Sequence, residues 1–254
     1  MADWSPSTYL IFEDERTRAA RDLLAQVPPD DRRKIVDVGC GPGNSTELLV
    51  DRYPDTEILG IDNSPAMLEA ARKRLPGLLF DMADANRWIP EPAVDLVFAN
   101  ATYQWIPGHV GQLGRVLAAL RPGAVLAVQM PDNLAEPTHR LMKEVAELGP
   151  WAERLVGAAR DPLPSAQVYH EALAPLAARV DIWRTTYNHV LADASAIVEF
   201  VSATGLRPFV APLSEPERRD FLARYTDEIA KAYPPMIGGK VMLRFPRLFI
   251  VARR

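Results

Sequence analysis

Hydrophobic and polar positions in the first half of the chain predict an alternation of strands and helices. An apolar, β-branched run at residues 35–38 ends in a glycine-rich turn, and helical spacing then begins with Leu48 and Leu49. Further apolar runs with the length of strands follow at residues 58–62, 78–80, 94–100 and 125–128. This order predicts a parallel sheet with helices on both faces, in a core at about residues 30–130.

More helices are expected on either side of this core. An amphipathic segment at about residues 13–25 precedes it, and helical patterns follow from residue 138, at 166–178 and within 193–236. Ser214 and Glu217 have the spacing of a capping box. Residues 149–165 have mixed charge and little periodicity, which predicts a mobile connector. Apolar runs at residues 180–187 and 241–251 predict two more strands.

The turn after the first strand suggests a ligand site. Gly39, Gly41 and Gly43 stand at alternate positions, and Asp37 lies two residues before the first of them. Glycine allows positive φ and leaves room for a ligand to approach the backbone. The N–H groups at the start of the next helix then offer an anion site. An ordinary strand-to-helix turn is the alternative, so the surrounding residues must decide.

Polar residues near the ends of the later strands favour the ligand site. Asp62 ends the second strand, 19 residues beyond the last glycine of the turn, close to where a ribose finds its acceptor in nucleotide-binding sheets. Ser64 caps the next helix, with Pro65 at its first position. Asp84 and Asn100 follow the third and fourth strands. Ligands of such sheets bind outside the carboxyl ends of the strands, so these residues are expected to share one site.

In this order and spacing the features resemble the class I S-adenosylmethionine-dependent methyltransferases. Dinucleotide-binding turns usually read G-x-G-x-x-G, whereas this chain reads G-x-G-x-G after an acid, as that superfamily does. The turn at residues 120–123 is also similar to the one before the superfamily's fifth strand. The resemblance implies a doubly wound α/β fold with a seven-stranded, mostly parallel sheet whose last strand is antiparallel. It implies a single domain over residues 1–254, with helical cap segments at about 138–178 and 193–236.

The same resemblance implies that the cofactor is S-adenosyl-L-methionine and that S-adenosyl-L-homocysteine is released. Asp62 would accept from the ribose, and Asp84 would hold the adenine amino group. The residues assigned to the cofactor in this way are Asp37, Gly39, Cys40, Gly41, Gly43, Asn44, Asp62, Asn63, Met67, Asp84, Ala85, Asn100 and Ala101.

Composition narrows the partners. The formal net charge of −4 argues against a nucleic-acid substrate, whose phosphates need a concentrated positive surface. No apolar run approaches the roughly 20 residues of a membrane span, and the first residues lack a signal-peptide pattern. We expect a soluble, cytoplasmic protein without nucleic-acid or membrane partners.

Residues that form disulfides or bind metals are sparse. Cys40 is the single cysteine, which excludes an internal disulfide, and its place in the turn is that of a small filler rather than a nucleophile. The four histidines, His109, His139, His170 and His189, have neither ligand spacing nor partner cysteines. No metal site is therefore expected.

The sequence after the fourth strand bears on which group is methylated. Enzymes that methylate amino groups of nucleic acids or glutamine have Asn/Asp-Pro-Pro-Tyr there, but this chain has Asn100-Ala101-Thr102-Tyr103 and lacks both prolines. Alcohol methylation generally needs a base or a metal. A carboxylate needs neither, because its pKa of about 4 leaves it ionised at neutral pH. Arginine forks would hold a polyanionic acceptor of this kind.

Longer stretches outside the cofactor motifs resemble a narrower family, the trans-aconitate 2-methyltransferases. They lie at residues 3–6, 129–133, 136–139, 181–187, 204–208 and 245–253. Residues 149–168 and 232–241 show no such match. The resemblance implies methyl transfer to one carboxylate of this small tricarboxylate, giving a monomethyl ester, and we expect a monomer. Positioning and electrostatics would carry catalysis, so no single catalytic residue is assigned.

For the tricarboxylate we predict Arg184 and Arg207 as the first contacts, followed by Tyr9, Trp105, His139 and Arg247. Arg184 lies in a predicted strand rich in aromatic residues, and Arg207 follows a glycine in the predicted cap. Either arginine could instead form a surface ion pair, and Tyr9 could instead anchor the N-terminus to the core. Replacing Arg184 by alanine is expected to raise KM for the acid more than it changes cofactor affinity.

Three alternatives stay open. A nicotinamide-dependent oxidoreductase uses the same kind of sheet, but the glycine spacing and the positions of Asp84 and Asn100 speak against it. A non-catalytic cofactor-binding protein would keep the pocket without transferring a methyl group. A methyltransferase could also act on another polycarboxylate or a fatty acid, and the arginines near the predicted cap favour the polyanion.

Overall fold

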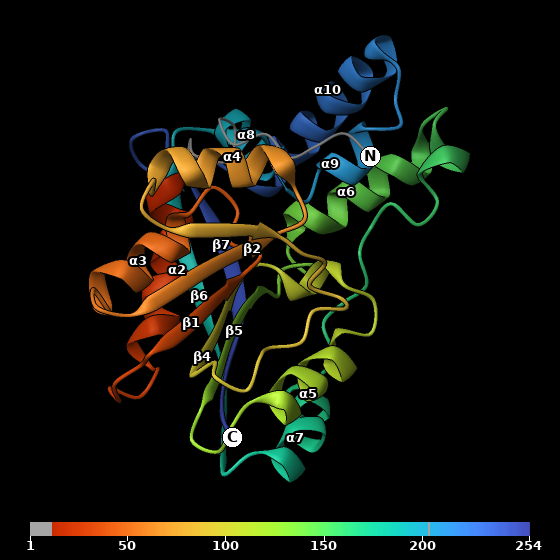
Figure 1. The fold of residues 1–254 in the computed structure, drawn as a ribbon. Helices are drawn as coiled ribbons and strands as arrows, with labels where there is room; N and C mark the ends of the chain where they lie inside the picture. The colour runs from red at the N-terminus through yellow and green to blue at the C-terminus, as the bar shows by residue number, and fades with distance from the viewer. Residues whose placement is uncertain (1–11, 203) are drawn as a thin grey trace.

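A twisted sheet forms the centre of the computed structural model, which describes residues 12–202 and 204–254. Within these ranges it has seven strands: β1 (Lys34–Val38), β2 (Glu57–Asp62), β3 (Leu79–Met82), β4 (Leu96–Asn100), β5 (Val125–Pro131), β6 (Arg179–Leu191) and β7 (Val241–Arg253). Their order is β3-β2-β1-β4-β5-β7-β6 (Figure 1). Strands β1 to β5 pair in parallel, and β7 lies antiparallel between β5 and β6. The predicted sheet, including its antiparallel last strand, is confirmed.

Helices cover both faces of this sheet. The α-helices of the described residues are α2 (Glu13–Ala25), α3 (Asn44–Arg52), α4 (Pro65–Arg74), α5 (His109–Ala119), α6 (Pro137–Leu148), α7 (Ala166–Leu173), α8 (Ala194–Ser202), α9 (Arg207–Val210) and α10 (Glu215–Ala232). Short 3-10 helices are η1 (Tyr103–Trp105), η2 (Ala152–Leu155) and η3 (Ala174–Leu176). Adjacent residues of β1 show the double coverage, because Ile35 and Val36 are both buried but belong to different apolar clusters.

A helical cap of α6, α8, α9 and α10 stands beside the sheet (Figure 1). The predicted capping box begins α10, where the backbone N–H of Ser214 donates to Glu217 Oε2 at 2.9 Å. The hydroxyl of Tyr225 donates to the carbonyl of Thr138 at 3.0 Å and so joins α10 to α6. Residues 149–165, predicted to be a mobile connector, contain η2 and the buried Trp151, whose ring lies 5.4 Å from that of Phe221. This segment is therefore anchored in the cap.

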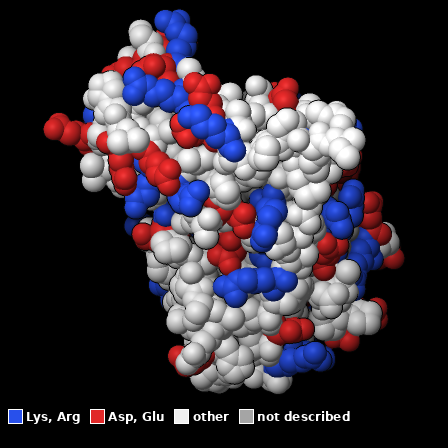
Figure 2. Space-filling view, turned by 180° about the vertical axis from the view of Figure 1, so that it is seen from behind, with Lys and Arg blue, Asp and Glu red and all other residues white. Residues whose placement is uncertain are grey.

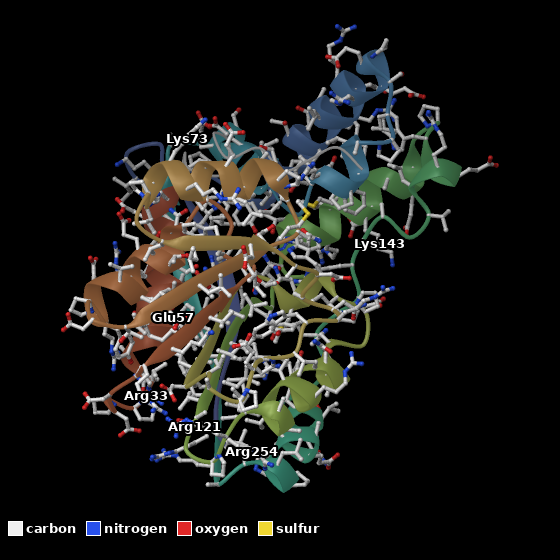
Figure 3. All side chains as sticks on the ribbon, viewed as in Figure 1. Arg33, Glu57, Lys73, Arg121, Lys143 and Arg254 are labelled. Atoms are coloured by element: carbon white, nitrogen blue, oxygen red, sulfur yellow. The ribbon has the colours of Figure 1, made fainter. Side chains whose placement is uncertain are left out.

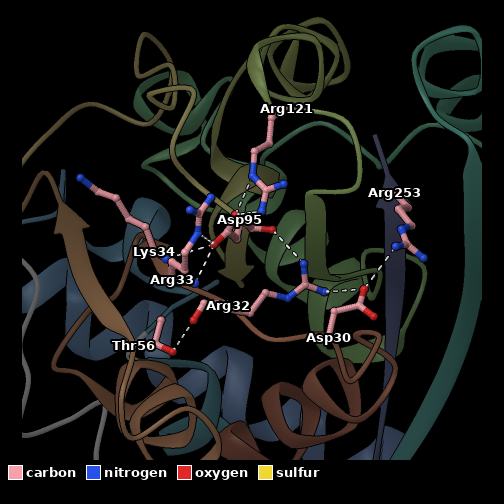
Figure 4. Close-up of polar contacts among 8 residues, drawn as sticks. All are labelled: Asp30, Arg32, Arg33, Lys34, Thr56, Asp95, Arg121 and Arg253. Carbon is pink, nitrogen blue, oxygen red and sulfur yellow. Dashed lines mark hydrogen bonds and ion pairs between the residues drawn. The ribbon is translucent and has the colours of Figure 1, made fainter.

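The amino ends of the central strands are joined by one buried acid, Asp95 (Figure 4). Its Oδ2 accepts from the backbone N–H groups of Arg33 at 2.6 Å and Lys34 at 3.3 Å, and its Oδ1 accepts from Arg121 Nε at 2.7 Å. Burial by itself would raise the pKa of Asp95, but these donors outweigh it and lower the pKa. Arg33, Arg121 and Arg254 lie along this edge of the molecule, far from the cap (Figure 3).

The surface mixes charges of both signs. On the face shown in Figure 2, Lys and Arg side chains lie beside Asp and Glu side chains rather than in a field of one sign. Eighteen ion pairs connect such groups within the described residues. No helix in the described part of the chain is long and apolar enough to cross a membrane.

Candidate active site

A cavity of about 410 Å³ lies at the carboxyl ends of the parallel strands, beside the cap. The strands β1 to β4 and the segments that follow them contribute Gly39, Gly41, Pro42, Asp62, Asn63, Met67, Ala83, Asp84, Ala85, Asn86, Asn100, Ala101, Thr102, Gln104, Trp105, Ile106 and Pro107. The helix α2, the end of β5, the segments after it and β7 contribute Arg16, Pro131, Asn133, Leu134, His139, Ala158, Ala159, Arg160, Phe200, Thr204, Gly205, Pro208, Phe209, Phe245 and Arg247. Because the charged lining residues described are acids in the first group and arginines in the second, we call these the acidic half and the basic half.

The glycine turn forms part of the acidic half. Gly39 has φ of 69°, and a Cβ there would lie 2.2 Å from Thr102 Oγ1, so only glycine fits. Its N–H and that of Cys40 both donate to the carbonyl of Ile61, at 2.7 and 3.0 Å. The N–H of Gly41 donates to Asp62 Oδ2 at 2.9 Å. These N–H groups bind the end of β2, so the turn offers fewer donors to an anion than its glycines suggest.

Hydrogen-bond acceptors gather in the acidic half. Asp62 ends β2 and joins two turns, since its Oδ1 accepts from the N–H of Ser64 at 2.9 Å while Oδ2 binds Gly41. Asp84 follows β3 and accepts from the N–H of Asn86 at 2.9 Å. Within the described residues, Asn100 Oδ1 and Gln104 Oε1 are buried and accept no hydrogen bond. Buried oxygens of this kind are costly unless a ligand supplies donors.

The chain leaves β4 through an unusual backbone conformation. Ala101 has φ of 59°, in the left-handed region that a residue with a Cβ rarely adopts. Its N–H donates to the carbonyl of Gln129 at 2.9 Å, which holds the turn against β5. Strained backbone of this kind is concentrated at functional sites, and Ala101 lines the cavity.

Asp37 supports the turn from behind. It is fully buried, and its Oδ2 accepts from the hydroxyls of Ser45 and Thr46, both at 2.7 Å. Burial raises the pKa of Asp37 to about 6, although these two hydroxyls counteract part of the effect. Its Oδ1 has no hydrogen-bond partner within the described residues.

Nine of the residues assigned to the cofactor line the cavity: Gly39, Gly41, Asp62, Asn63, Met67, Asp84, Ala85, Asn100 and Ala101. The other four, Asp37, Cys40, Gly43 and Asn44, are absent from the described lining. Cys40 packs in a small apolar cluster, Gly43 caps α3 with φ of 92°, and Asn44 Nδ2 donates to Glu13 Oε1 at 2.6 Å. These residues shape the turn.

The predicted cofactor fits this half chemically. S-adenosylmethionine presents an ammonium group, two ribose hydroxyls and an adenine amino group, all of which donate hydrogen bonds. The acidic half presents the oxygens of Asp62, Asp84 and Asn100, the last of them with no partner in the described structure. A donor-rich ligand thus meets an acceptor-rich surface.

Arg247 is the buried cation nearest the sheet in the basic half. It lies on β7 opposite Pro131 of β5 and is only 3 % exposed. Its Nη1 donates to Gln129 Oε1 at 3.2 Å, and its guanidinium lies 4.8 Å from the centre of the Phe245 ring. The sequence prediction named this residue, and the structure brings it to the cavity.

Arg16 also lines the basic half, but the sequence reading missed it. It lies on α2, and its Nη2 donates to the carbonyl of Phe200, 184 positions later, at 2.9 Å. A signal was present, because Arg16 stands three and four positions before Ala19 and Ala20 and therefore shares their buried face. A charged residue on the apolar side of a helix marks a candidate functional group.

Arg160 is the second missed residue. It comes from the segment between η2 and α7, and its Nη2 donates to the carbonyl of Pro131 at 2.7 Å and to Asn133 Oδ1 at 3.1 Å. Burial lowers the pKa of Arg160, while Asp132 nearby opposes that effect. No local pattern announced this residue, because its segment has neither helical nor strand periodicity.

His139 and Trp105, which the sequence predicts to contact the acid, both line the cavity. Burial, with the charge of Arg160 as a second cause, lowers the pKa of His139 to about 3. Its Nδ1 lies 3.1 Å from Thr138 Oγ1, and a Cβ at Gly205 would lie 2.6 Å from its Nε2. His139 is therefore neutral at neutral pH. Trp105 belongs to η1 and is half-buried.

The structure does not bring the two arginines ranked first into the described cavity wall. Arg184 lies on the edge strand β6, and its Nε donates to Asp132 Oδ2 at 2.6 Å. Arg207 begins α9, where the neighbouring Pro208 lines the cavity instead. Tyr9 lies outside the described residues. Within those residues no cluster of histidine, cysteine and acid side chains could hold a metal.

Comparison with known sequences adds a family. A model described as a methyltransferase domain matches residues 35–123. The trans-aconitate 2-methyltransferase of Rhodopseudomonas palustris (strain BisB18) is 59 % identical over 254 residues, which is 99 % of each chain. The protein of that name from Methylobacterium radiotolerans is 55 % identical over 262 residues, covering 100 % of this chain and 99 % of the relative.

Comparison with solved structures supports the fold. The YcgJ protein from Bacillus subtilis has a TM-score of 0.60 at 12 % identity, covering 93 % of this chain and 98 % of that one. Haemonchus contortus phosphoethanolamine N-methyltransferase 2, solved with S-adenosylhomocysteine, has a TM-score of 0.55 at 15 % identity, covering 93 % and 52 %. At these identities the likeness concerns architecture alone.

Proposed function

The chain belongs to the trans-aconitate 2-methyltransferase family, and we propose that it transfers the methyl group of S-adenosylmethionine to one carboxylate of trans-aconitate. The products are a monomethyl ester and S-adenosylhomocysteine. Full-length identity of 55–59 % to relatives of that name is the observation that carries this conclusion. The same relatives decide against the oxidoreductase and the non-catalytic binding protein.

The acidic half would hold the cofactor. When bound, S-adenosylmethionine supplies a methyl group on a positively charged sulfur. Asp62 and Asp84 would accept hydrogen bonds from it, and Asn100 Oδ1, which has no partner in the described structure, would accept another. Gly39 and Gly41 leave the backbone open to the ligand. Asp37 would act one layer further out, by fixing the turn through Ser45 and Thr46.

The basic half would hold the acid. Its arginines face a substrate that is already ionised at neutral pH, so no general base is needed. Arg160 and Arg247 would bind carboxylates through charge-assisted hydrogen bonds. His139 is neutral and would contribute a hydrogen bond rather than a charge, and Trp105 would help to exclude water. Positioning the carboxylate oxygen against the methyl group is then the catalytic task.

We propose that the chain works as a single-domain monomer in the cytoplasm. Residues of the sheet and of the cap line the same cavity, which supports a single domain. The core at about residues 30–130 would bind the cofactor, and the cap segments would close the acceptor side. Size-exclusion chromatography with light scattering measures the mass of the particle, and a dimer would contradict the monomer proposal.

The reaction is tested by mass spectrometry. Purified protein is incubated with methyl-labelled S-adenosylmethionine and one acid at a time: trans-aconitate, cis-aconitate, isocitrate or citrate. A labelled monomethyl ester that is strongest with trans-aconitate supports the proposal. Label on a different acid would show that this acid, and not trans-aconitate, is the methyl acceptor. No label on any acid would contradict the proposed reaction.

A further inference from the structure

The guanidinium of Arg160 forms no ion pair with an acid of the described residues, so its charge can pair with an anionic ligand. Its three hydrogen bonds go to uncharged groups: the backbone carbonyls of Asp161 and Pro131 and the side-chain Oδ1 of Asn133. A guanidinium has five N–H donors, so at least two are not used by these contacts. Within the described residues Asp132 is the acid that influences Arg160, but its Oδ2 already binds Arg184 at 2.6 Å. Arg184 thus occupies the acid that could otherwise have neutralised Arg160.

The chemistry of methyl transfer limits which carboxylate an arginine can hold tightly. The reacting carboxylate must keep a lone pair of one oxygen available to attack the methyl group. A guanidinium fork that engages both oxygens withdraws that electron density, so it suits a carboxylate that does not react. Arg160 is fixed at the end of β5, by Pro131 and Asn133, whereas the last of the proposed cofactor residues is Ala101, after β4.

We propose that Arg160 is a specificity-determining residue that binds a non-reacting carboxylate of the substrate. It would make the enzyme prefer a tricarboxylate over a dicarboxylate of the same carbon skeleton. This inference rests on the proposed function. It assigns to the segment between η2 and α7, which carries Ala158, Ala159 and Arg160 into the cavity wall, the role of reading the third negative charge.

Binding without turnover tests this assignment directly. Calorimetry on protein saturated with S-adenosylhomocysteine gives Kd for trans-aconitate and for three dicarboxylates, each lacking a different carboxylate: itaconate, glutaconate and mesaconate. Wild type is compared with Arg160→Gln, which keeps a donor for the Pro131 carbonyl, and with Arg160→Lys, which keeps the charge. Arg154→Gln is the matched control, since Arg154 lies in η2, just before this segment, and pairs with Glu217 outside the described cavity lining.

The expected result is selective. Arg160→Gln should raise Kd for trans-aconitate about 30-fold, which is within the range for a hydrogen bond between charged groups. For the one dicarboxylate that lacks the carboxylate bound by Arg160, the same substitution should raise Kd less than 3-fold. Arg160→Lys should recover part of the loss, and Arg154→Gln should resemble wild type.

Two results would overturn the proposal. An equal loss of affinity for all four acids would indicate that Arg160 has only a structural role. Unchanged affinity for trans-aconitate in Arg160→Gln would show that Arg160 does not bind the substrate. Failure of the proposed function looks different, because wild-type protein would then neither bind nor methylate trans-aconitate.

Discussion

The buried acids at the two ends of the parallel strands differ in their hydrogen bonding and in the direction in which their pKa is shifted. At the amino ends, Asp95 has both oxygens engaged by N–H groups and an arginine, and its pKa is lowered. At the carboxyl ends, Asp37 has one oxygen without a partner in the described structure, and burial raises its pKa to about 6. Asn100 Oδ1, also at the carboxyl ends, is likewise without a described partner. The satisfied Asp95 stabilises the fold, whereas Asn100, which lines the cavity, keeps hydrogen-bonding capacity for a ligand.

The largest effect on stability is expected at the amino ends. Replacing Asp95 by asparagine leaves Arg121 and two backbone N–H groups without the carboxylate that they surround. We expect Asp95→Asn to lower the free energy of unfolding by about 3 kcal/mol, because several hydrogen bonds to one buried charge are weakened together. Urea unfolding measures this loss. KM for trans-aconitate should stay within 2-fold of wild type, and a large change in KM would contradict the separation of the two ends.

Acid should destabilise the protein through its buried histidines. Burial lowers the pKa of His139 to about 3 and of His189 to about 4, whereas unfolded histidine titrates at about 6.5. As pH falls below 6.5, protons bind the unfolded chain first and favour it. Asp37 opposes this, because its folded pKa of about 6 lies above the unfolded value of 3.8, so the folded state takes up a proton there first. Burial also lowers the pKa of His109, so three histidines oppose one acid and these groups together make the protein less stable as the pH falls from 6 to 4, which urea unfolding at several pH values measures.

His189 offers a way to isolate one part of this slope. Its ring is buried against the rings of Tyr187, Phe200 and Phe245, so phenylalanine should fit in its place. We expect His189→Phe to flatten the pH dependence by about 1.4 kcal/mol per pH unit in the same window. Urea unfolding at pH 4.5, 5.5 and 6.5 checks it. An unchanged slope would show that His189 titrates normally in the folded protein.

The carboxyl-end counterpart of the Asp95 variant should be mild. Asparagine at position 37 keeps an oxygen for the hydroxyls of Ser45 and Thr46, and it removes a charge that burial already disfavours. We expect Asp37→Asn to change the free energy of unfolding at pH 7 by less than about 1 kcal/mol. Measured beside Asp95→Asn, it compares the two acids directly. Equal losses in the two variants would erase the contrast between the ends.

The smallest expected effect concerns the strained residue after β4. Glycine accepts the φ of 59° found at Ala101 without the steric penalty of about 1–2 kcal/mol, but it adds entropy to the unfolded chain. The net change for Ala101→Gly should be a stabilisation of about 0.5 kcal/mol. Thermal unfolding measures it, with Ala99→Gly in the buried part of β4 as a destabilising control. Destabilisation by Ala101→Gly would mean that the left-handed conformation costs the protein little.

Sequence patterns predicted the acidic half far better than the basic half, and the reason is topological. Asp62, Asp84 and Asn100 follow successive strands, so the rule that ligands bind at carboxyl ends places them together without further information. Arg16 and Arg160 reach the cavity only through tertiary packing. Arg16 depends on Phe200 in α8, and Arg160 depends on Pro131 and Asn133 at the end of β5.

Arg184, the arginine ranked first from the sequence, also shows that local pattern does not predict which residues reach the cavity. Aromatic neighbours made Arg184 look well placed, and its strand was predicted correctly. The insertion of β7 between β5 and β6 then moves that strand to the edge of the sheet, and Arg184 pairs with Asp132. Arg247, on the inserted strand, reaches the cavity instead. Strand order, which local pattern does not encode, decided between the two.

The most direct test of a cavity divided into an acidic and a basic half is a pair of affinity measurements on two variants. Asp62→Asn and Arg247→Met are each titrated with S-adenosylmethionine, and then with trans-aconitate at saturating S-adenosylhomocysteine. We predict that Asp62→Asn weakens the cofactor at least 10-fold and the acid less than 3-fold, and that Arg247→Met does the reverse, as the loss of a charged hydrogen bond implies. Parallel losses of both ligands in both variants, or the opposite assignment, would contradict the division.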